Sequence, residues 1–325
     1  MKTRLTELCG LQIPIMLGGM YLVGRAELAA AVSEAGGLGT ITSKTLGTPE
    51  ALREEIQKIK ALTKKPFAVN LNLFPSTTPT PNQAFIEVMA EEGVPIAETS
   101  GRSPEDILPL LKEAGIKVIH KVPGIRYAKT AQRLGVDAVT VVGQETGGHP
   151  GMSDVGTLVL VRRAVQELEI PVIAGGGFAD GYGLAAALAL GADGILMGTR
   201  FMATKEAHVH PHLQAFLQRA TENDTLVLQR SIGYPSRVGK NAFAEDILKR
   251  EEEGATLAEL LPLLSGKRSL AVYFEGDMEA GIFSLGQSVG LFADIPSVKE
   301  LMERIVREAE EALKRLQTIF GGDGP

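Results

Sequence analysis

The chain has 325 residues, of which 44% are hydrophobic and 22% are charged, and its formal net charge is −6. This balance is typical of a folded globular protein and argues against extended disorder. Acidic and basic residues are mixed without a basic cluster, so no nucleic-acid partner is expected. No run approaches the roughly 18 apolar residues of a membrane span, and no apolar leader follows Met1, so the sequence predicts a cytoplasmic protein without membrane contact.

Apolar, β-prone runs alternate with helical patterns over the first 200 residues or so. The predicted strands are 13–17, 39–42, 67–71, 95–99, 118–121, 138–142, 172–174 and 194–197. The predicted helices are 25–35, 49–62, 82–92, 104–114, 125–134, 158–168 and 181–190. The strands are continuous apolar runs, as expected for parallel strands that are covered on both faces. Eight strand–helix units predict an α/β fold of the TIM (β/α)8 barrel type, with a doubly wound open sheet as the alternative.

The pattern changes after residue 205. Residues 206–274 are mainly helical in pattern and predict a smaller subdomain or lid, with helices at 211–219, 243–252 and 256–264. Residues 1–205 and 275–325 would then form the barrel and a C-terminal helix. That helix, 298–318, is amphipathic, so we expect it to pack on the barrel.

Two glycine-rich turns follow the seventh and eighth predicted strands. Gly175, Gly176 and Gly177 end the seventh strand, and Gly198 and Thr199 follow the eighth. Glycine lets backbone N–H groups approach an anion closely, and barrels commonly bind phosphate at this position. Either turn alone could simply reverse the chain, but the two together predict a phosphate site.

A histidine stands in the polar loop 143–156 after the sixth predicted strand. His149 has glycines and a proline around it, which indicates a constrained turn at the mouth of the barrel. Since an unperturbed imidazole titrates at about pH 6.5, His149 could accept or donate a proton at neutral pH. A loop histidine that only makes hydrogen bonds is the structural alternative.

Further polar residues end the third and fifth predicted strands. Lys121 could bind a phosphate or an electron-rich ring edge, or it could be a solvated lysine of the rim. Asn70 and Asn72 can hydrogen-bond the edge of a heterocycle, although asparagine is also a common turn residue. Met20, beside two glycines after the first strand, could pack on the face of a ring or belong to the core.

Three histidines, His208, His210 and His212, alternate with other residues in a pattern that could bind a metal. In an extended segment the three side chains would lie on one face. Pro211 interrupts the run, and no carboxylate or cysteine lies within it. We therefore predict a polar start to the subdomain and no metal site.

The chain resembles the nitronate monooxygenase family, formerly called 2-nitropropane dioxygenases. The similarity runs almost end to end, and it is carried by Asn70 and by the segments 14–20, 145–149, 173–181, 191–201 and 281–290. The Gly-Gly-His sequence at 147–149 and the Met-Gly-Thr-Arg-Phe sequence at 197–201 are its more specific parts. The resemblance implies a TIM barrel that binds FMN without a covalent bond, with a helical subdomain over the flavin.

The resemblance also implies roles for individual residues. His149 would be the base near flavin N5, and Lys121 would be the second catalytic residue. The implied cofactor-binding residues are Gly18, Gly19, Met20, Asn70, Asn72, Lys121, Gly147, Gly175, Gly176, Gly177, Gly198, Thr199 and Gln287. Of these, Gly19, Met20, Asn70, Lys121 and Gly147 would surround the isoalloxazine, and the glycines after the seventh and eighth strands would hold the phosphate with Thr199.

Three flavin-dependent activities are implied. The first oxidises alkyl nitronates with O2 to a carbonyl compound and nitrite. The second follows from the segments 119–121 and 276–279, which are similar to bacterial NADH:quinone reductases. There hydride passes from NADH to FMN and then to a quinone, and the loop 75–79 would gate the nicotinamide. The third is FMN-dependent enoyl-acyl-carrier-protein reduction, because those enzymes share the flavin motifs.

A phosphate or nucleotide sensor without turnover is the non-enzymatic alternative. A histidine on a constrained loop and a lid both favour an enzyme instead. The expected partners are therefore small molecules, a nitronate or a quinone together with O2 or NADH. The sequence leaves both a monomer and a homodimer open.

Overall fold

The structure is a computed structural model that describes residues 1–74, 80–264 and 266–321, so the predicted gate at 75–79 lies outside the described residues. Within these ranges, eight parallel strands form one sheet in the order β1-β8-β7-β6-β5-β4-β3-β2. They are β1 Ile15–Leu17, β2 Gly39–Thr42, β3 Phe67–Asn72, β4 Ile96–Ser100, β5 Lys117–Val122, β6 Ala138–Val142, β7 Val172–Gly175 and β8 Gly194–Met197.

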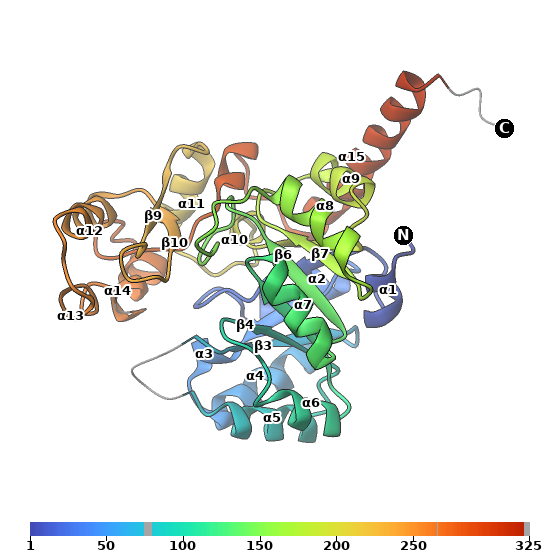
Figure 1. The fold of residues 1–325 in the computed structure, drawn as a ribbon, viewed down its shortest axis with the longest axis horizontal. Helices are drawn as coiled ribbons and strands as arrows, with labels where there is room; N and C mark the ends of the chain where they lie inside the picture. Colours follow the sequence, from blue (N-terminus) through green and yellow to red (C-terminus); the bar gives the residue numbers. More distant parts are fainter. Residues whose placement is uncertain (75–79, 265, 322–325) are drawn as a thin grey trace.

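The sheet closes on itself between β1 and β2. Met16 and Leu38 form a parallel bridge there, and the Leu17 N–H donates to the Leu38 carbonyl at 2.9 Å. Helices surround the strands (Figure 1). The predicted TIM barrel is therefore confirmed, and the open doubly wound sheet is wrong.

The helices between the strands occur where the sequence predicts them. They are α2 Ala26–Glu34, α4 Pro49–Leu62, α5 Asn82–Glu91, α6 Leu108–Glu113, α7 Ile125–Leu134, α8 Thr157–Glu167 and α9 Gly181–Ala189, with shorter turns at α3 Ser43–Leu46 and α10 Thr199–Met202. Helix α6 begins four residues later than predicted. Pro109 is the reason, because it has no N–H to donate to Glu105 and so fits only the first turn of a helix.

Side chains inside the barrel change from apolar to polar toward the C-terminal ends of the strands. The apolar level consists of Met16, Leu38, Ala68, Ile96, Ile119, Ala138, Ile173 and Leu196, and helix α1 (Arg4–Cys9) closes it below with Leu5 and Cys9. Because side chains alternate along a strand, the residues two positions later also face inward. These are Thr40, Asn70, Glu98, Lys121 and Thr140, and they form a polar floor beneath the mouth of the barrel.

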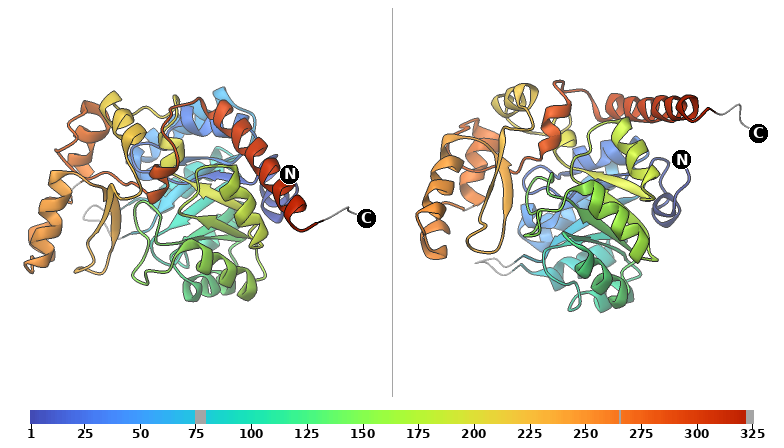
Figure 2. Two further views of the ribbon diagram at one scale, coloured as in Figure 1. Left: turned by 90° about the horizontal axis from the view of Figure 1, so that it is seen from above. Right: turned by 45° about the horizontal axis from the view of Figure 1, so that its top comes forward.

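A subdomain lies beside the mouth (Figures 1 and 2). Its elements are α11 Pro211–Arg219, β9 Thr225–Leu228, β10 Ser236–Gly239, α12 Ala242–Glu252, α13 Leu257–Leu260, α14 Gly266–Leu270 and a π-helical turn at Ala271–Glu275. The antiparallel hairpin β9–β10 was not among the predicted elements. Leu228, Val238 and Ile247 belong to a separate small core, whereas α11 joins the barrel core through Leu213 and Leu217.

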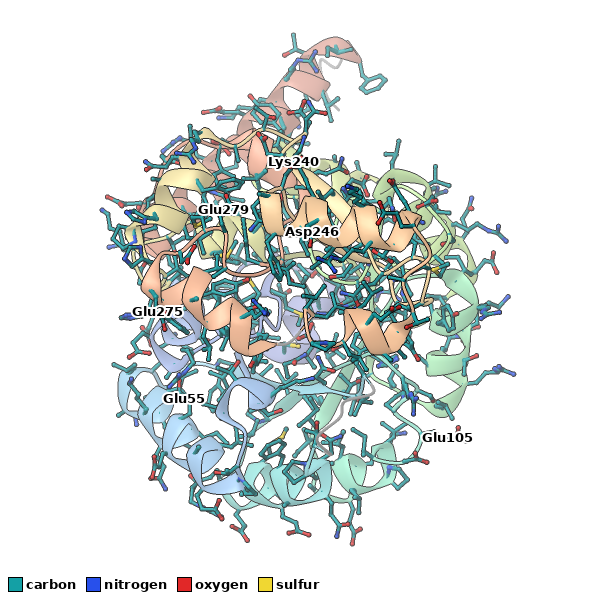
Figure 3. All side chains as sticks on the ribbon, turned by 90° about the vertical axis from the view of Figure 1, so that its left-hand side faces the viewer. Glu55, Glu105, Lys240, Asp246, Glu275 and Glu279 are labelled. Atoms are coloured by element: carbon teal, nitrogen blue, oxygen red, sulfur yellow. The ribbon has the colours of Figure 1, made fainter. Side chains whose placement is uncertain are left out.

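The outer face of the subdomain carries charged side chains such as Lys240 and Asp246 (Figure 3). At the far side of the molecule, helix α15 (Val298–Ile319) packs against α9 (Figure 1). Arg200, which follows β8, is fully buried and donates to the Asp294 carboxylate at 2.7 Å, so the segment before α15 is tied to the barrel. No helix within the described residues is both long and apolar enough to cross a membrane.

Candidate active site

A cavity of about 870 Å³ opens at the C-terminal ends of the strands, which is where TIM barrels carry their active sites. Loops after several strands line it, together with the hairpin turn of the subdomain at Gly233 and Tyr234. The predicted site residues that line it are Gly18, Gly19, Met20, Asn70, Asn72, Lys121, Gly147, His149, Gly176, Gly177, Gly198 and Thr199. The structure thus brings together residues from six strand ends.

Two predicted cofactor residues do not line this cavity. Gly175 is the last residue of β7, and its carbonyl accepts from the Gly143 N–H at 3.1 Å. Gln287 begins a 3₁₀ turn, and its N–H donates to the Glu145 carbonyl at 2.9 Å. In the structure both residues shape the loops around the cavity, and their contact with a cofactor stays a prediction.

The loops after β7 and β8 form one end of the cavity. Gly176 and Gly177 have φ values of 90° and 86°, which side chains other than glycine rarely adopt. The backbone N–H groups of Gly176, Gly177, Gly198 and Thr199 donate to no acceptor in the described part of the chain. Free amides gathered at two strand ends fit an anion such as a phosphate. The Thr199 hydroxyl oxygen accepts from the Gly286 N–H at 2.9 Å and thereby connects this end to the segment before α15.

The opposite end of the cavity rests on a buried carboxylate that the sequence analysis missed. Glu98 on β4 is fully buried. It accepts from the Asn70 amide at 2.7 Å and from the Gly19 N–H at 2.9 Å, and its other oxygen lies 3.1 Å from the Lys121 Nζ. A side chain at Gly19 would place a Cβ 2.4 Å from the Asn70 side chain, so glycine is required. A charged residue within an apolar strand was the available sequence signal.

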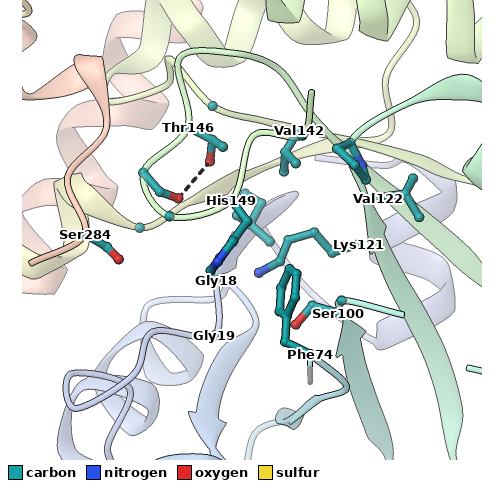
Figure 4. A pocket seen from close by; sticks show the side chains of 18 of the residues that line it. Gly18, Gly19, Phe74, Ser100, Lys121, Val122, Val142, Thr146, His149 and Ser284 are labelled. Atoms are coloured by element: carbon teal, nitrogen blue, oxygen red, sulfur yellow. Dashed lines mark hydrogen bonds between the residues drawn. The ribbon is translucent and has the colours of Figure 1, made fainter. Parts of the chain in front are cut away.

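His149 faces the cavity, beside Lys121 and Phe74 and above Gly18 and Gly19 (Figure 4). Its ring lies over the Phe74 ring, with the two centroids 4.2 Å apart. The side chain of His149 is exposed to the cavity, and neighbouring residues surround it on its other sides. Desolvation, together with the charges of Lys121 and Lys44, lowers the pKa of His149 to about 4. The imidazole is therefore neutral at pH 7, because its pKa lies further below 7 than the ordinary value of about 6.5 used in the sequence analysis.

The loop that carries His149 is held from two sides. Gly148 and Arg237 exchange backbone hydrogen bonds of 2.9 and 2.6 Å, and the Arg237 Nε donates to the Gln144 carbonyl at 3.0 Å. On the barrel side, the Glu145 carboxylate accepts from the Thr157 hydroxyl at 2.8 Å. Hairpin strand β10 thus extends its pairing onto the loop that carries His149. Nothing in the local sequence of Arg237 indicated this contact.

Lys44 is another cavity residue that the sequence analysis missed. It lies in α3 just after β2, and burial lowers the pKa of its amine. The three histidines of the subdomain lie elsewhere: the rings of His210 and His212 are 4.7 Å apart, and the His212 Nδ1 lies 2.9 Å from the Gly276 carbonyl oxygen. Among the described residues, no group of three histidine, cysteine or acidic side chains could hold a metal ion.

The family model for nitronate monooxygenase matches residues 2–308. The chain belongs to this family. A solved structure of FabK from Thermotoga maritima is 41% identical, with a TM-score of 0.92, over 98% of this chain and 99% of that chain. A "(3aS,4S,5R,7aS)-5-hydroxy-7a-methyl-1-oxo-octahydro-1H-indene-4-carboxyl-CoA dehydrogenase" of Rhodococcus jostii (strain RHA1) is 33% identical, over 98% of each chain. A probable nitronate monooxygenase of Staphylococcus saprophyticus is 30% identical, over 97% of this chain and 99% of the relative.

These relatives agree with an oxidoreductase on a TIM barrel. Members of the family are generally flavin-dependent, and the cavity described above has the features that a flavin nucleotide requires. Free amides stand at the end formed by the loops after β7 and β8, where a phosphate would fit. At its other end, polar side chains and glycines can contact the edge and the face of a ring.

Proposed function

We propose that this chain is an FMN-dependent oxidoreductase that reduces the double bond of a 2-enoyl thioester with electrons from NADH. Gly176, Gly177, Gly198 and Thr199 would hold the phosphate of FMN. Gly18, Gly19, Met20, Asn70, Asn72, Lys121 and Gly147 would surround its ring. Bound there, the flavin would supply the hydride-transfer chemistry.

The hydrogen-bond donors at the end of the cavity next to Glu98 carry this proposal. We call this end of the cavity the ring end, because the flavin ring would lie there. The amines of Lys121 and Lys44 and the neutral His149 line the same cavity. Glu98, the carboxylate that pairs with Lys121, already accepts hydrogen bonds from the Gly19 N–H and the Asn70 amide. Addition of hydride to the β-carbon of an enoyl thioester moves negative charge onto the α-carbon and the thioester oxygen. Donors that face this charge stabilise it, and one of them supplies the proton that completes the reduction.

Lys121 and His149 have the chemistry for these two tasks. The Lys121 ammonium can donate to the thioester oxygen, where negative charge develops. The neutral imidazole of His149 can relay a proton, since one ring nitrogen would release its proton to the substrate while the other nitrogen accepts one from water. Overall, NADH and one proton are consumed for each double bond reduced, and the products are NAD⁺ and the saturated thioester.

The comparison with relatives favours a thioester substrate. The dehydrogenase of R. jostii and its counterpart in Mycobacterium tuberculosis, at 33% and 34% identity, are both named for a carboxyl-CoA, which is a thioester. Nitronate oxidation is the second candidate. A nitronate is an anion that the same amines would bind, and the probable nitronate monooxygenase of S. saprophyticus is 30% identical.

One anaerobic experiment separates the candidates. The purified protein is loaded with FMN, reduced with NADH, and then mixed with crotonyl-CoA, benzoquinone or no acceptor, while propyl-2-nitronate is offered separately to the oxidised protein. We expect reoxidation by crotonyl-CoA with formation of butyryl-CoA. Reoxidation by benzoquinone alone would indicate the quinone reductase, and reduction by the nitronate alone would indicate the monooxygenase. A protein that binds no FMN would contradict all three.

A further inference from the structure

Glu98 is a buried carboxylate whose contacts all lead to residues at the ring end of the cavity. It lies on β4 between the inward-facing Ile96 and Ser100, and its side chain has no exposed surface. A carboxylate in such a place is costly unless donors and an opposite charge surround it. Hydrophobic side chains fill the level directly below, so the polar contacts of Glu98 need an explanation beyond filling the barrel.

The two oxygens of Glu98 have different partners. Oε2 accepts from the Asn70 amide nitrogen at 2.7 Å and from the Gly19 N–H at 2.9 Å. Oε1 forms an ion pair with Lys121, whose Nζ lies 3.1 Å away, and accepts no hydrogen bond from the described residues. One oxygen therefore fixes two neutral groups, and the other faces the ammonium alone.

These contacts connect elements that are far apart in sequence. Asn70 on β3 is the register partner of Glu98, Lys121 follows on β5, and Gly19 stands after β1. With its nitrogen directed at Glu98, the Asn70 amide presents its oxygen elsewhere as an acceptor. The charge of Glu98 also balances the Lys121 ammonium within the cavity.

From this arrangement we propose that Glu98 is a positioning residue, which holds the Lys121 ammonium and the Asn70 amide in their working orientation against the cofactor ring. The inference rests on the proposed function for the identity of the reaction. Without the charge of Glu98, Lys121 loses the group that fixes its Nζ, and an uncompensated positive charge stays beside the ring. Asn70 then also loses its preference for one amide orientation.

The test is a double-mutant cycle with Glu98→Gln, Lys121→Met and the double variant. We expect Glu98→Gln to lower kcat by about tenfold or more while KM changes by less than about threefold, because the Lys121 ammonium is no longer held in position to donate. If Glu98 acts mainly through Lys121, the losses in the double variant are less than multiplicative, because only the effect through Asn70 is left to add to that of Lys121→Met. Losses that multiply in the double variant would overturn the proposal.

The midpoint potential of bound FMN is a second readout that needs no substrate. The unbalanced Lys121 charge in Glu98→Gln favours the reduced, more negative flavin, so its potential shifts to a more positive value. In the double variant that shift disappears. An unchanged potential in Glu98→Gln would overturn the proposal even if activity fell.

Glu55→Gln is the matched control. Like Glu98, Glu55 is a buried carboxylate with a basic partner, in its case Arg25 at 2.8 Å. It lies on the outer helix α4, away from the cavity. It should lose stability without moving the flavin potential. If Glu98→Gln does not fold, the double variant should fold, because it removes both charges. Failure of both variants to fold would make Glu98 structural and overturn the proposal. A wild-type protein that binds FMN but reduces no thioester would contradict the proposed function and leave the potential measurement intact.

Discussion

The ring of Phe74 lies over the ring of His149, with their centroids 4.2 Å apart and their planes inclined by 31°. Phe74 stands just after β3, where its N–H donates to the Asn72 Oδ1 at 2.9 Å, and His149 stands in the loop after β6. Two loops from different sides of the barrel therefore meet over the cavity. The phenyl ring covers one face of the imidazole and contributes to the desolvation that keeps it neutral.

Removal of that cover should change the titration of His149. In Phe74→Ala, water reaches the imidazole, so the pKa of His149 should rise from about 4 toward its ordinary value of 6.5. Phe74→Leu, which keeps an apolar cover, should change it less. A pH titration followed by NMR of the histidine ring measures both variants. Equal pKa values in the wild type and Phe74→Ala would show that other groups desolvate the ring.

His149 itself should be needed for turnover and dispensable for cofactor binding. The free amides of the phosphate end are contributed by other loops, so His149→Ala should retain FMN. Its turnover should fall by roughly 10²–10⁴-fold, the range for loss of a group that transfers protons. Absorbance of the bound flavin and steady-state rates provide the two measurements. Loss of FMN from His149→Ala would make the residue structural.

The pH dependence of stability should reveal the titration of the buried His120 ring. Its ring is buried, its Nδ1 lies 2.8 Å from the Thr99 hydroxyl, and desolvation lowers its pKa to about 4. Between this value and the unfolded pKa of 6.5, the unfolded chain binds a proton that the native state does not. Stability should therefore be complete above pH 6.5 and fall as the pH drops toward 4. From pH 7.5 to 5 the loss from His120 is about 2 kcal/mol.

Urea unfolding across this pH range measures the effect. His149 titrates similarly, so the contribution of His120 is obtained as the difference between the wild type and His120→Gln. The variant should be less stable at pH 7.5 but should lose less stability on acidification. Parallel curves for the two proteins would contradict the assignment.

One methyl group added to the loop after β7 should weaken the binding of FMN. Gly176 has a φ of 90°, and a Cβ there would lie 3.0 Å from the Thr146 N. Gly176→Ala should therefore displace the loop and weaken FMN binding by about tenfold, or about 1.4 kcal/mol. Gly47→Ala is the control, since Gly47 has a φ of 79° with nothing within 4 Å of a Cβ. It should cost about 1 kcal/mol of stability and leave FMN affinity unchanged.

Local patterns were sufficient to predict the barrel and much of the cavity. The apolar strands, the glycines after β7 and β8, and His149 all produce signals within a few residues of themselves. The hairpin β9–β10 escaped prediction because each strand has only four residues and lies between stronger helical patterns. Helix α6 is shorter than predicted because Pro109 lacks the N–H that a helix starting at residue 104 would need at this position.

The residues that sequence reasoning missed depend on neighbours that only the closed fold provides. The role of Glu98 follows from the pairing of β4 with β3 and β5, which sets Asn70 and Lys121 beside it. Lys44 reaches the cavity because β2 closes the ring with β1. Such contacts have no fixed spacing in the sequence, so a residue-by-residue analysis cannot identify them.

Arg237 joins the subdomain to the loop that carries His149. Its guanidinium donates to the Gln144 carbonyl at 3.0 Å and to the Thr225 hydroxyl at 2.9 Å, and its side chain is buried. Arg237→Ala removes the side-chain contact to the loop but keeps the backbone bridge to Gly148. We expect the loop to loosen, so kcat should fall by about tenfold and the His149 ring should react faster with an imidazole-modifying reagent such as diethylpyrocarbonate.

Thr225→Val is the matched variant for Arg237→Ala. It removes the second partner of the guanidinium and leaves the bond to Gln144, so the rate of His149 modification should stay close to that of the wild type. His149→Ala defines the background reaction of the remaining histidines. If His149 is modified at the same rate in Arg237→Ala and in Thr225→Val, the backbone bridge alone holds the loop that carries His149, and the guanidinium serves only the stability of the subdomain.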